Sequence, residues 1–449
     1  MSSEEAVVLT SAKRNARFIT LNRVRKLNSL NTEMVSLITP NLLKYAKEPN
    51  QCVIILNSNS PKALCAGGDV AEVANQIVKK NPNYGADFFD KEYNLDYIIS
   101  TFPKPYISIM DNITFGGGVG LSVHAPFRIA TERTKLAMPE MDIGFFPDVG
   151  TTFFLPRLDD KLGYYIALTS SVLKGEDAYF SGFATHYIKS EKIGQLTNRL
   201  ADLQPAESGY FDQVNQILNE FQDELPKDYQ YFLSTDEIKI IKDAFSKSTI
   251  DEVLEYFKTE GSEFSKKTLK TLLTKPRTSI AIGHELMNRG LKNTIKEQFE
   301  LEMVAATNIM TIPAESNDFA KGVVHKLVDK IKDPFFPKWN DPSIVTSEFI
   351  NKIVTKSETT KKYLPDVLIQ KWFGVDYSQY PYNYGLPRNK EVSDFIAGTD
   401  GSNRTYLPTP NEVFKHFKGK SGIELKVKQL LDLHGETAKY DHKYVTWKD

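Results

Sequence analysis

The stretch CVIILNS at residues 52–58 is a short apolar run with a cluster of β-branched residues, which is typical of a strand buried on both faces. PYISIMD (105–111) and FRIAT (127–131) have the same character, and AVVLTSAKRNARFITLN (6–22) indicates two strands joined by a polar turn. Helical patterns lie between these runs. The first third of the chain therefore predicts a mostly parallel sheet with crossover helices, which is an α/β fold.

The rest of the chain predicts helices and a boundary. From about residue 158 the pattern becomes helical, and Ser234 and Glu237 have the spacing of a capping box. The run DPFFPKWNDPS (333–343) is rich in Pro and Asp and indicates a domain boundary. We therefore expect three parts: a core over about 6–230, a helical part over about 231–339, and a mostly helical C-terminal extension over 340–449.

Composition excludes several classes of protein. The 449 residues include 56 Lys and Arg against 57 Asp and Glu, so no overall basic field favours direct nucleic-acid binding. No apolar run approaches the ~18 residues of a membrane helix. The only cysteines, Cys52 and Cys65, are too few for a disulfide framework and indicate a reducing compartment. The acidic N-terminus MSSEEAVV resembles neither a signal peptide nor a transit peptide.

Two glycine clusters, CAGGD (65–69) and FGGGVG (115–120), each follow a predicted strand. Ordinary tight turns are one explanation. A dinucleotide-binding loop fails for the second cluster, because the required last glycine is Leu121. The seven histidines show no metal-ligand spacing, so no metal is expected. If the two turns lie together, their backbone N–H groups can bind one oxygen atom, which is an oxyanion hole.

Carboxyl groups occur in apolar surroundings. MPEMDIGFFPDVG (138–150) places Glu140 and Asp148 in a loop rich in Met and Phe, and Glu92 lies on an apolar helical stripe. A buried acid has a raised pKa and suits proton transfer. Glu92 alone fits equally well as a rim residue with its carboxylate in water. Together, glycine turns and acids indicate carbonyl chemistry that needs no metal or redox cofactor.

Three stretches carry a family resemblance. LCAGGDV (64–70), ITFGGGVGLS (113–122) and AMPEMDIGFFPDVG (137–150) resemble the enoyl-CoA hydratase/isomerase (crotonase) superfamily, and within it the 3-hydroxyisobutyryl-CoA hydrolases. The resemblance runs from about residue 6 to 339. It implies a crotonase-like core, a ββα superhelix, within an acyl-CoA hydrolase domain over 1–339.

The resemblance also assigns roles to five residues. It gives the oxyanion-binding N–H groups to Gly68 and Gly117, and substrate contacts to Glu92, Glu140 and Asp148. Glu140 would attack the thioester, either by activating water or by forming a transient anhydride. Asp148 would orient the substrate hydroxyl or protonate the leaving thiolate, and Glu92 would hold that hydroxyl.

The resemblance implies hydrolysis of 3-hydroxyisobutyryl-CoA in valine breakdown, in the mitochondrial matrix, with CoA as part of the substrate and no separate cofactor. A hydratase or isomerase is the alternative within the fold. It is disfavoured because hydratases carry a second catalytic glutamate at the position of Gly120.

Relatives of the family also occur in the small subunit of the mitochondrial ribosome, which is an alternative of another class. The C-terminal extension, with basic runs such as 415–420, is compatible with ribosome association or self-association, and equally with a solvated helix face. We expect it to carry no catalytic group, so that a folded chain ending near 339 should keep its hydrolytic chemistry.

Overall fold

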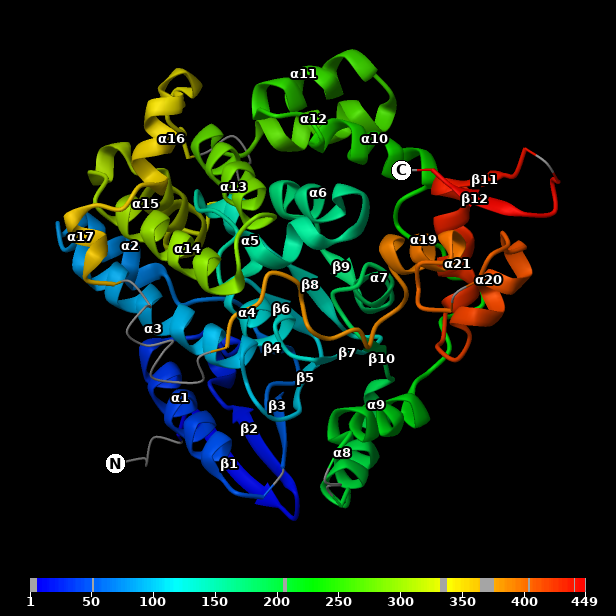
Figure 1. Ribbon diagram of the computed structural model, residues 1–449. Coiled ribbons are helices and arrows are strands. Elements are labelled where there is room, and N and C mark those ends of the chain that lie inside the picture. The colour runs from blue at the N-terminus through cyan, green and yellow to red at the C-terminus, as the bar shows by residue number, and fades with distance from the viewer. Residues whose placement is uncertain are drawn as a thin grey trace.

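The computed structural model describes residues 6–50, 52–204, 208–331, 337–363, 375–402, 404–439 and 441–448. The N-terminal residues 1–5 and the junction residues 333–336 lie outside this part. Within it, the larger sheet has six strands in the order β1-β2-β3-β5-β7-β10 (Figure 1). They are Val8–Lys13 (β1), Ala16–Leu21 (β2), Val53–Ser58 (β3), Tyr106–Met110 (β5), Phe127–Ala130 (β7) and His186–Tyr187 (β10). Within this sheet only β1 and β2 pair antiparallel, which confirms the prediction of a mostly parallel sheet.

Strand β3 explains why this sheet is covered on both sides. Val53 and Ile55 belong to a hydrophobic cluster with helices Ile193–Ala201 (α8) and Tyr210–Phe221 (α9). Their neighbours Ile54 and Leu56 belong to the main core with Thr32–Lys47 (α1) and Pro82–Ser100 (α3). Alternate side chains of a strand point to opposite faces. The run at 52–58 is therefore buried on both faces, as the sequence predicted.

A smaller sheet positions the functional residues. Its order is β4-β6-β8-β9, formed by Ala63–Cys65, Ile113–Phe115, Lys135–Ala137 and Leu173–Lys174. The first three strands are mutually parallel, so their carboxyl ends lie side by side. Strands of two or three residues leave little periodicity in a sequence, which is why the last of them was not anticipated in the helical region.

Helices form the rest of the protein before the extension. They are Ala71–Val78 (α2), Gly117–Val123 (α4), Thr151–Phe154 (α5), Leu162–Thr169 (α6), Gly175–Phe180 (α7), Thr235–Phe245 (α10), Ile250–Glu260 (α11), Glu263–Leu273 (α12), Arg277–Gly290 (α13), Ile295–Met310 (α14) and Asp318–Val323 (α15). Short turns of helix include Glu140–Ile143 (η2) and the π-helix Val324–Val328 (η7). The capping box of Ser234 and Glu237 is present at α10, as predicted.

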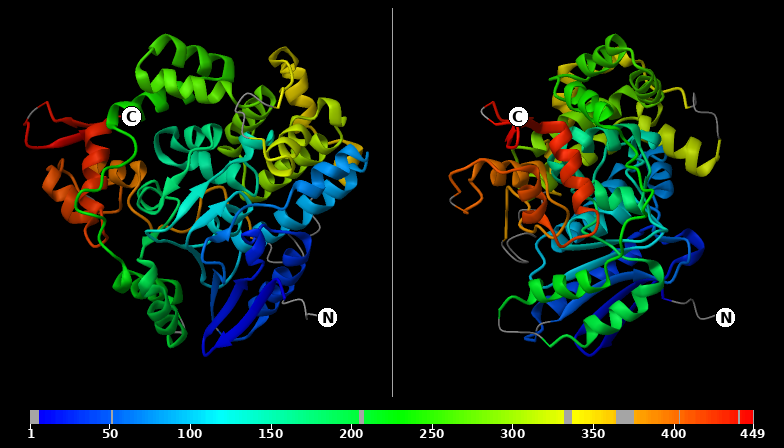
Figure 2. Two further views of the ribbon diagram at one scale, coloured as in Figure 1. Left: turned by 180° about the vertical axis from the view of Figure 1, so that it is seen from behind. Right: turned by 90° about the vertical axis from the view of Figure 1, so that its right-hand side faces the viewer.

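The C-terminal extension packs on the core. It contains Ser347–Val354 (α16), Glu358–Lys361 (α17), Asn389–Ala397 (α19), Pro410–Phe417 (α20), Ile423–His434 (α21) and a hairpin of Gly435–Thr437 (β11) and Val445–Trp447 (β12), which the sequence did not predict. Asn308 of α14 donates to the carbonyl of Ile353 at 2.8 Å. Tyr179 of α7 donates to the carbonyl of Ser421 at 2.8 Å, and α19 to α21 lie beside this part of the core (Figures 1 and 2).

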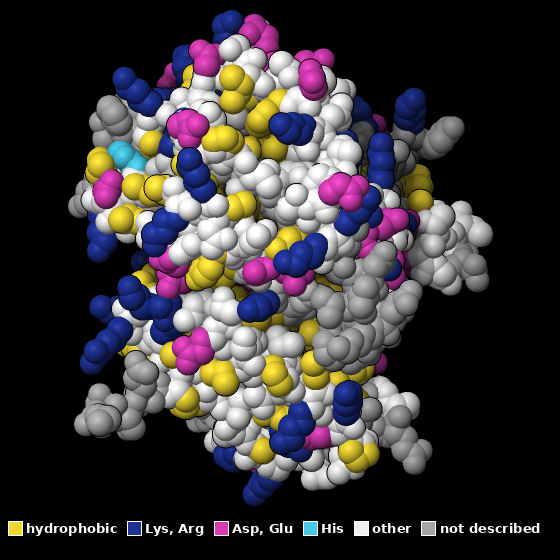
Figure 3. Space-filling model, turned by 90° about the vertical axis from the view of Figure 1, so that its left-hand side faces the viewer, with side chains coloured by type: hydrophobic (Ala, Val, Ile, Leu, Met, Phe, Trp, Pro, Cys, Tyr) yellow, Lys and Arg dark blue, Asp and Glu magenta, His cyan; other side chains and the backbone are white. Residues whose placement is uncertain are grey.

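The surface carries mixed charge. Figure 3 shows one face, on which Lys and Arg side chains lie among acidic and scattered hydrophobic ones. This mixture agrees with the formal net charge of -1. Among the helices of the described ranges, none is both long and apolar enough to cross a membrane.

Candidate active site

The two glycine clusters meet at the edge of the smaller sheet. Gly68 follows β4, and Gly117 is the first residue of α4, which follows β6. Because β4 and β6 are parallel neighbours, both turns come off the same edge. A Cβ atom placed on Gly117 would lie 3.4 Å from the backbone nitrogen of Gly68. The structure therefore brings together the two residues that the sequence identified.

The N–H groups of these glycines are free to bind a ligand. The N–H of Gly117 belongs to the first turn of α4, where helical amides have no intrahelical acceptor. Among the described residues, no acceptor is bonded to the N–H of Gly68 or Gly117. Both glycines line a cavity of about 300 Å³. Two such donors on one cavity can bind a single carbonyl oxygen.

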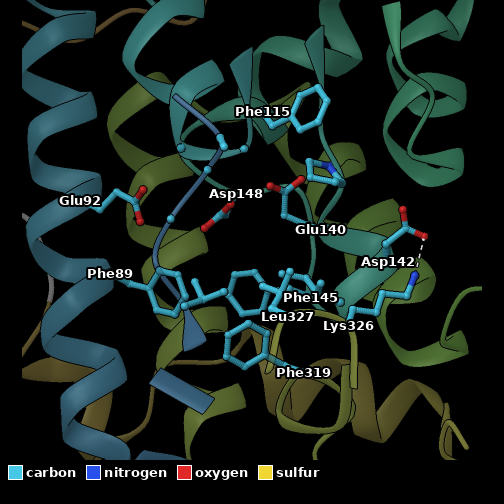
Figure 4. Close-up of a pocket in the computed structure, with 18 residues that line it drawn as sticks. Phe89, Glu92, Phe115, Glu140, Asp142, Phe145, Asp148, Phe319, Lys326 and Leu327 are labelled. Atoms are coloured by element: carbon cyan, nitrogen blue, oxygen red, sulfur yellow. Dashed lines mark ion pairs between the residues drawn. The ribbon is translucent and has the colours of Figure 1, made fainter. Parts of the chain in front are cut away.

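Three acids enter the same cavity, one from helix α3 and two from the loop after β8 (Figure 4). Glu92 comes from α3, Glu140 begins η2 after β8, and Asp148 follows on the same loop. Their exposed fractions are only 2%, 7% and 5%. Glu92 is thus buried in the cavity, which excludes the alternative of a rim residue with its carboxylate in water. Asp148 accepts a hydrogen bond of 2.7 Å from the Tyr93 hydroxyl.

Apolar side chains form the rest of the wall. Phe89, Phe145, Phe319 and Leu327 lie together on one side of the acids (Figure 4). At the edge of the cavity, Lys326 pairs with Asp142 at 3.3 Å. Among the described lining residues Lys326 is the one cation, and it is already paired. The three buried acids therefore have no positive partner inside the cavity.

Burial raises the pKa of all three acids. The pKa of Glu92 and of Glu140 lies well above the ordinary value because of burial and then because of the nearby charge of Asp148. Burial raises the pKa of Asp148 to about 7, while the Tyr93 hydrogen bond opposes the shift. All three acids therefore retain their protons to a higher pH than ordinary carboxyl groups do, and Asp148 exchanges its proton near neutral pH.

The glycines also make room for the acids. A Cβ on Gly116, whose φ is +46°, would lie 2.5 Å from Oε1 of Glu140, and a Cβ on Gly117 would lie 2.4 Å from Oε1 of Glu92. Such distances are shorter than any ordinary contact. Side chains at 116 and 117 would therefore displace the carboxyl groups of Glu140 and Glu92.

A further buried acid, Asp96, lies beside Gly120, and the sequence did not indicate it. A Cβ on Gly120 would lie 2.6 Å from Cβ of Val149 and 2.9 Å from Oδ2 of Asp96. Asp96 is fully buried, one turn beyond Glu92 on α3, and burial followed by repulsion from Glu92 raises its pKa. A glutamate side chain thus has no space at position 120.

Other supporting residues were also missed by sequence reasoning. Glu302 of α14 accepts hydrogen bonds from the backbone nitrogens of Gly150 at 2.6 Å and Thr152 at 3.1 Å. Burial raises the pKa of Glu302 to about 8. Its position in a helix of mixed apolar and acidic residues gave no signal that it would bind a loop 150 residues away.

The described residues contain no group of three or more His, Cys, Asp or Glu side chains that could hold a metal ion. Fold and site together define an α/β protein that can bind a carbonyl oxygen at two backbone N–H groups beside buried carboxyl groups.

Comparisons with known proteins agree with this class. A family model described as enoyl-CoA hydratase/isomerase matches residues 16–354, and the chain belongs to this family. The chain is 36% identical to small ribosomal subunit protein mS47 of Neurospora crassa, over 98% of this chain and 88% of that protein. It is 38% identical to the mitochondrial 3-hydroxyisobutyryl-CoA hydrolase of Danio rerio, over 75% of this chain and 86% of that protein.

A solved structure supports the same fold. The crystal structure of a carnitinyl-CoA dehydratase from Mycobacterium thermoresistibile aligns with a TM-score of 0.69 and 28% identity, covering 79% of this chain and 98% of that one. The prediction of a crotonase-like core with a helical C-terminal region is therefore confirmed.

Proposed function

We propose that this protein hydrolyses the thioester of 3-hydroxyisobutyryl-CoA to 3-hydroxyisobutyrate and CoA. The observation that carries the proposal is the cavity in which two free backbone N–H groups face three buried acids. Relatives with the name 3-hydroxyisobutyryl-CoA hydrolase support the substrate. The lack of space for an acid at Gly120 favours hydrolysis over hydration, which uses a second carboxylate there.

The first step of the proposed mechanism is a proton transfer from Glu140 to Asp148. The thioester carbonyl oxygen binds between the N–H groups of Gly68 and Gly117. The pKa of Asp148 is about 7, so this residue can accept and release a proton near neutral pH. Burial, followed by the charge of Asp148, raises the pKa of Glu140 well above its ordinary value. In the proposed mechanism Asp148 accepts the proton of Glu140, and Glu140 becomes the attacking carboxylate. As the carbonyl oxygen gains charge, both N–H groups bind it more strongly.

The remaining steps return every proton. The carboxylate of Glu140 attacks the carbonyl carbon, the carbon–sulfur bond breaks, and protonated Asp148 gives its proton to the leaving thiolate. Water then hydrolyses the resulting anhydride, with Asp148 accepting one of its protons. The products are 3-hydroxyisobutyric acid, which releases its proton to solvent, and the Glu140 carboxylate, which takes the proton back from Asp148. In the alternative route Glu140 activates water, which attacks the thioester directly. Single-turnover hydrolysis in H₂¹⁸O separates the routes, because only the anhydride route can place ¹⁸O in the Glu140 side chain.

Glu92 accounts for the choice of acyl group. A protonated Glu92 at the cavity wall can donate to, and accept from, the hydroxyl of a 3-hydroxyacyl group. An acyl group without a hydroxyl leaves this buried acid without a partner. We propose a place for the reaction in valine breakdown in the mitochondrial matrix, with no cofactor beyond the CoA of the substrate.

The test is thiol release by the purified protein from a panel of CoA esters. We expect 3-hydroxyisobutyryl-CoA to give a higher kcat/KM than isobutyryl-CoA, which differs by one hydroxyl. Equal values for the two esters would contradict the role of Glu92, and no thiol release from either would contradict the proposed function.

A second function is favoured by the length of one match. The match to the ribosomal protein covers 98% of this chain and therefore includes the C-terminal extension, whereas the match to the hydrolase covers 75%. We propose that the extension also binds the small subunit of the mitochondrial ribosome. Co-sedimentation of the full chain with isolated small subunits tests this, and a protein that stays at the top of the gradient would refute it.

A further inference from the structure

A segment of the C-terminal extension lies against the C-terminal end of α4, the helix whose first residue lines the active-site cavity. Residues 375–384, here called the aromatic strap, run past α4 (orange in Figure 1). The Tyr380 hydroxyl shares its one proton between the carbonyls of Ala125, at 2.6 Å, and His124, at 3.1 Å. Arg128 donates to the Tyr380 hydroxyl at 3.1 Å and to the carbonyl of Ala125 at 2.7 Å. The strap therefore satisfies the carbonyls at the end of α4, the helix whose first residue is Gly117.

The side chain of His124 connects the end of α4 to the loop that carries Asp148. Its Nε2 atom lies 2.8 Å from the carbonyl oxygen of Val149, the residue after Asp148. A carbonyl can only accept, so Nε2 carries the proton. Burial lowers the pKa of His124 to about 4, and the ring is therefore neutral in working conditions.

The loop at Asp148 needs this support because its backbone is strained. Val149 has φ of +54°, which is unfavourable for a β-branched residue. The next residue, Gly150, lies so close to His124 that a Cβ there would be 2.5 Å from Nε2. Glu302 accepts the Gly150 N–H. The backbone just after Asp148 is thus hydrogen-bonded to His124 at the Val149 carbonyl and to Glu302 at the Gly150 N–H.

We propose that His124 is a positioning residue for Asp148, and that the aromatic strap holds His124 in place. This rests on the role of Asp148 in the proposed function. Neither His124 nor any described residue of the strap lines the cavity. Their effect is to fix where the Asp148 carboxyl lies relative to Glu140 and the substrate.

The first test compares His124→Gln with His124→Leu in the full chain. The amide nitrogen of glutamine replaces Nε2–H, whereas leucine removes the donor at similar size. We expect leucine to lower kcat roughly 10- to 100-fold with little change in KM, because small displacements of a reacting group have effects of this size. Glutamine should retain kcat within about threefold. Equal losses in both variants, or no loss in the leucine variant, would overturn the proposal.

A measurement without substrate separates this inference from the proposed function. Hydrogen exchange of a peptide covering 145–155 should be faster in His124→Leu than in His124→Gln, because the Val149 carbonyl loses its donor. Equal exchange in the two variants would refute the positioning role. If the wild-type protein releases no thiol from any ester, only the proposed function fails, and the exchange result still decides this inference.

The strap is tested by a matched pair of hydroxyl deletions. Tyr380→Phe keeps the ring but removes the bonds to His124 and Ala125, and should lower kcat and speed exchange over 145–155. Tyr382→Phe is the control, because the Tyr382 ring stacks on Phe211 and no described residue is hydrogen-bonded to its hydroxyl. Equal behaviour of the two variants would show that the strap does not support the Asp148 loop.

Discussion

Replacing Tyr93 with phenylalanine isolates the electrostatics of Asp148. The substitution keeps the ring and removes the hydroxyl that donates to Oδ2 of Asp148 at 2.7 Å. A hydrogen bond to a charged group contributes ~1.5–3 kcal/mol, and one pKa unit corresponds to ~1.4 kcal/mol. The bond stabilises the ionised form. Its loss should therefore raise the pKa of Asp148 from about 7 by roughly one to two units.

In the proposed mechanism this shift in the pKa of Asp148 changes the pH dependence of kcat/KM. Asp148 must be ionised to accept the proton of Glu140, so kcat/KM rises with pH through the pKa of Asp148 in the free enzyme. In Tyr93→Phe we expect kcat/KM at pH 7 to fall roughly 5- to 50-fold, and the loss to disappear toward pH 9.5 as Asp148 ionises. The assay is thiol release from 3-hydroxyisobutyryl-CoA at low substrate concentration over this pH range.

A matched control removes another buried hydroxyl. The Tyr106 hydroxyl is buried and has no hydrogen-bond partner in the described part of the chain, so Tyr106→Phe should leave the profile unchanged. An unchanged midpoint in Tyr93→Phe would refute the role of the hydroxyl. A loss of the same size at every pH would show that Tyr93 acts by shape and not through the ionisation of Asp148.

Three further predictions use the same assay or the same acids. Glu140→Gln should lower thiol release by ~10²–10⁴ while a CoA ester still binds, and near-normal turnover would reject Glu140 as the attacking group. Crotonyl-CoA should be hydrated far more slowly than 3-hydroxyisobutyryl-CoA is hydrolysed, as measured by loss of enoyl absorbance, because Gly120 has no space for an acid. Asp148→Asn should stabilise the substrate-free protein at pH 8 by up to about 4 kcal/mol in urea unfolding. The folded-state pKa of about 7 lies above the ordinary 3.8, so this acid destabilises the fold increasingly between about pH 4 and pH 7, and the difference should vanish below pH 4.

The parts of the site that the sequence predicts are those encoded in short stretches. Gly68 and Gly117 lie in glycine clusters after strands, and Glu140 and Asp148 lie in one apolar loop. Each can therefore be recognised from the residues next to it in the sequence. Tyr93 gave no such signal, because its partner Asp148 lies 55 positions away in the chain. The strap could not be predicted either, because Tyr380 and His124 are 256 positions apart. The proposed role of the strap predicts that a folded chain ending near 339, which lacks Tyr380, has a lower kcat, whereas the sequence analysis expects it to keep its activity. The kcat of the folded truncation decides between the two predictions.

The glycine cluster at 115–120 contains more glycines than an oxyanion hole requires. One N–H donor needs a single glycine, yet Gly116, Gly117 and Gly120 each place a carboxyl oxygen within 3 Å of where a Cβ would be. Each glycine therefore admits one acid: Glu140, Glu92 and Asp96 respectively. Acids packed so closely, without a cation among them, repel one another and retain protons to higher pH. The same lack of side chains that leaves room for the proposed oxyanion hole thus lets the acids approach one another, which raises their pKa values, and at Gly120 it leaves no space for the glutamate of a hydratase. The positions of these glycines and acids therefore favour hydrolysis over hydration already in the substrate-free protein.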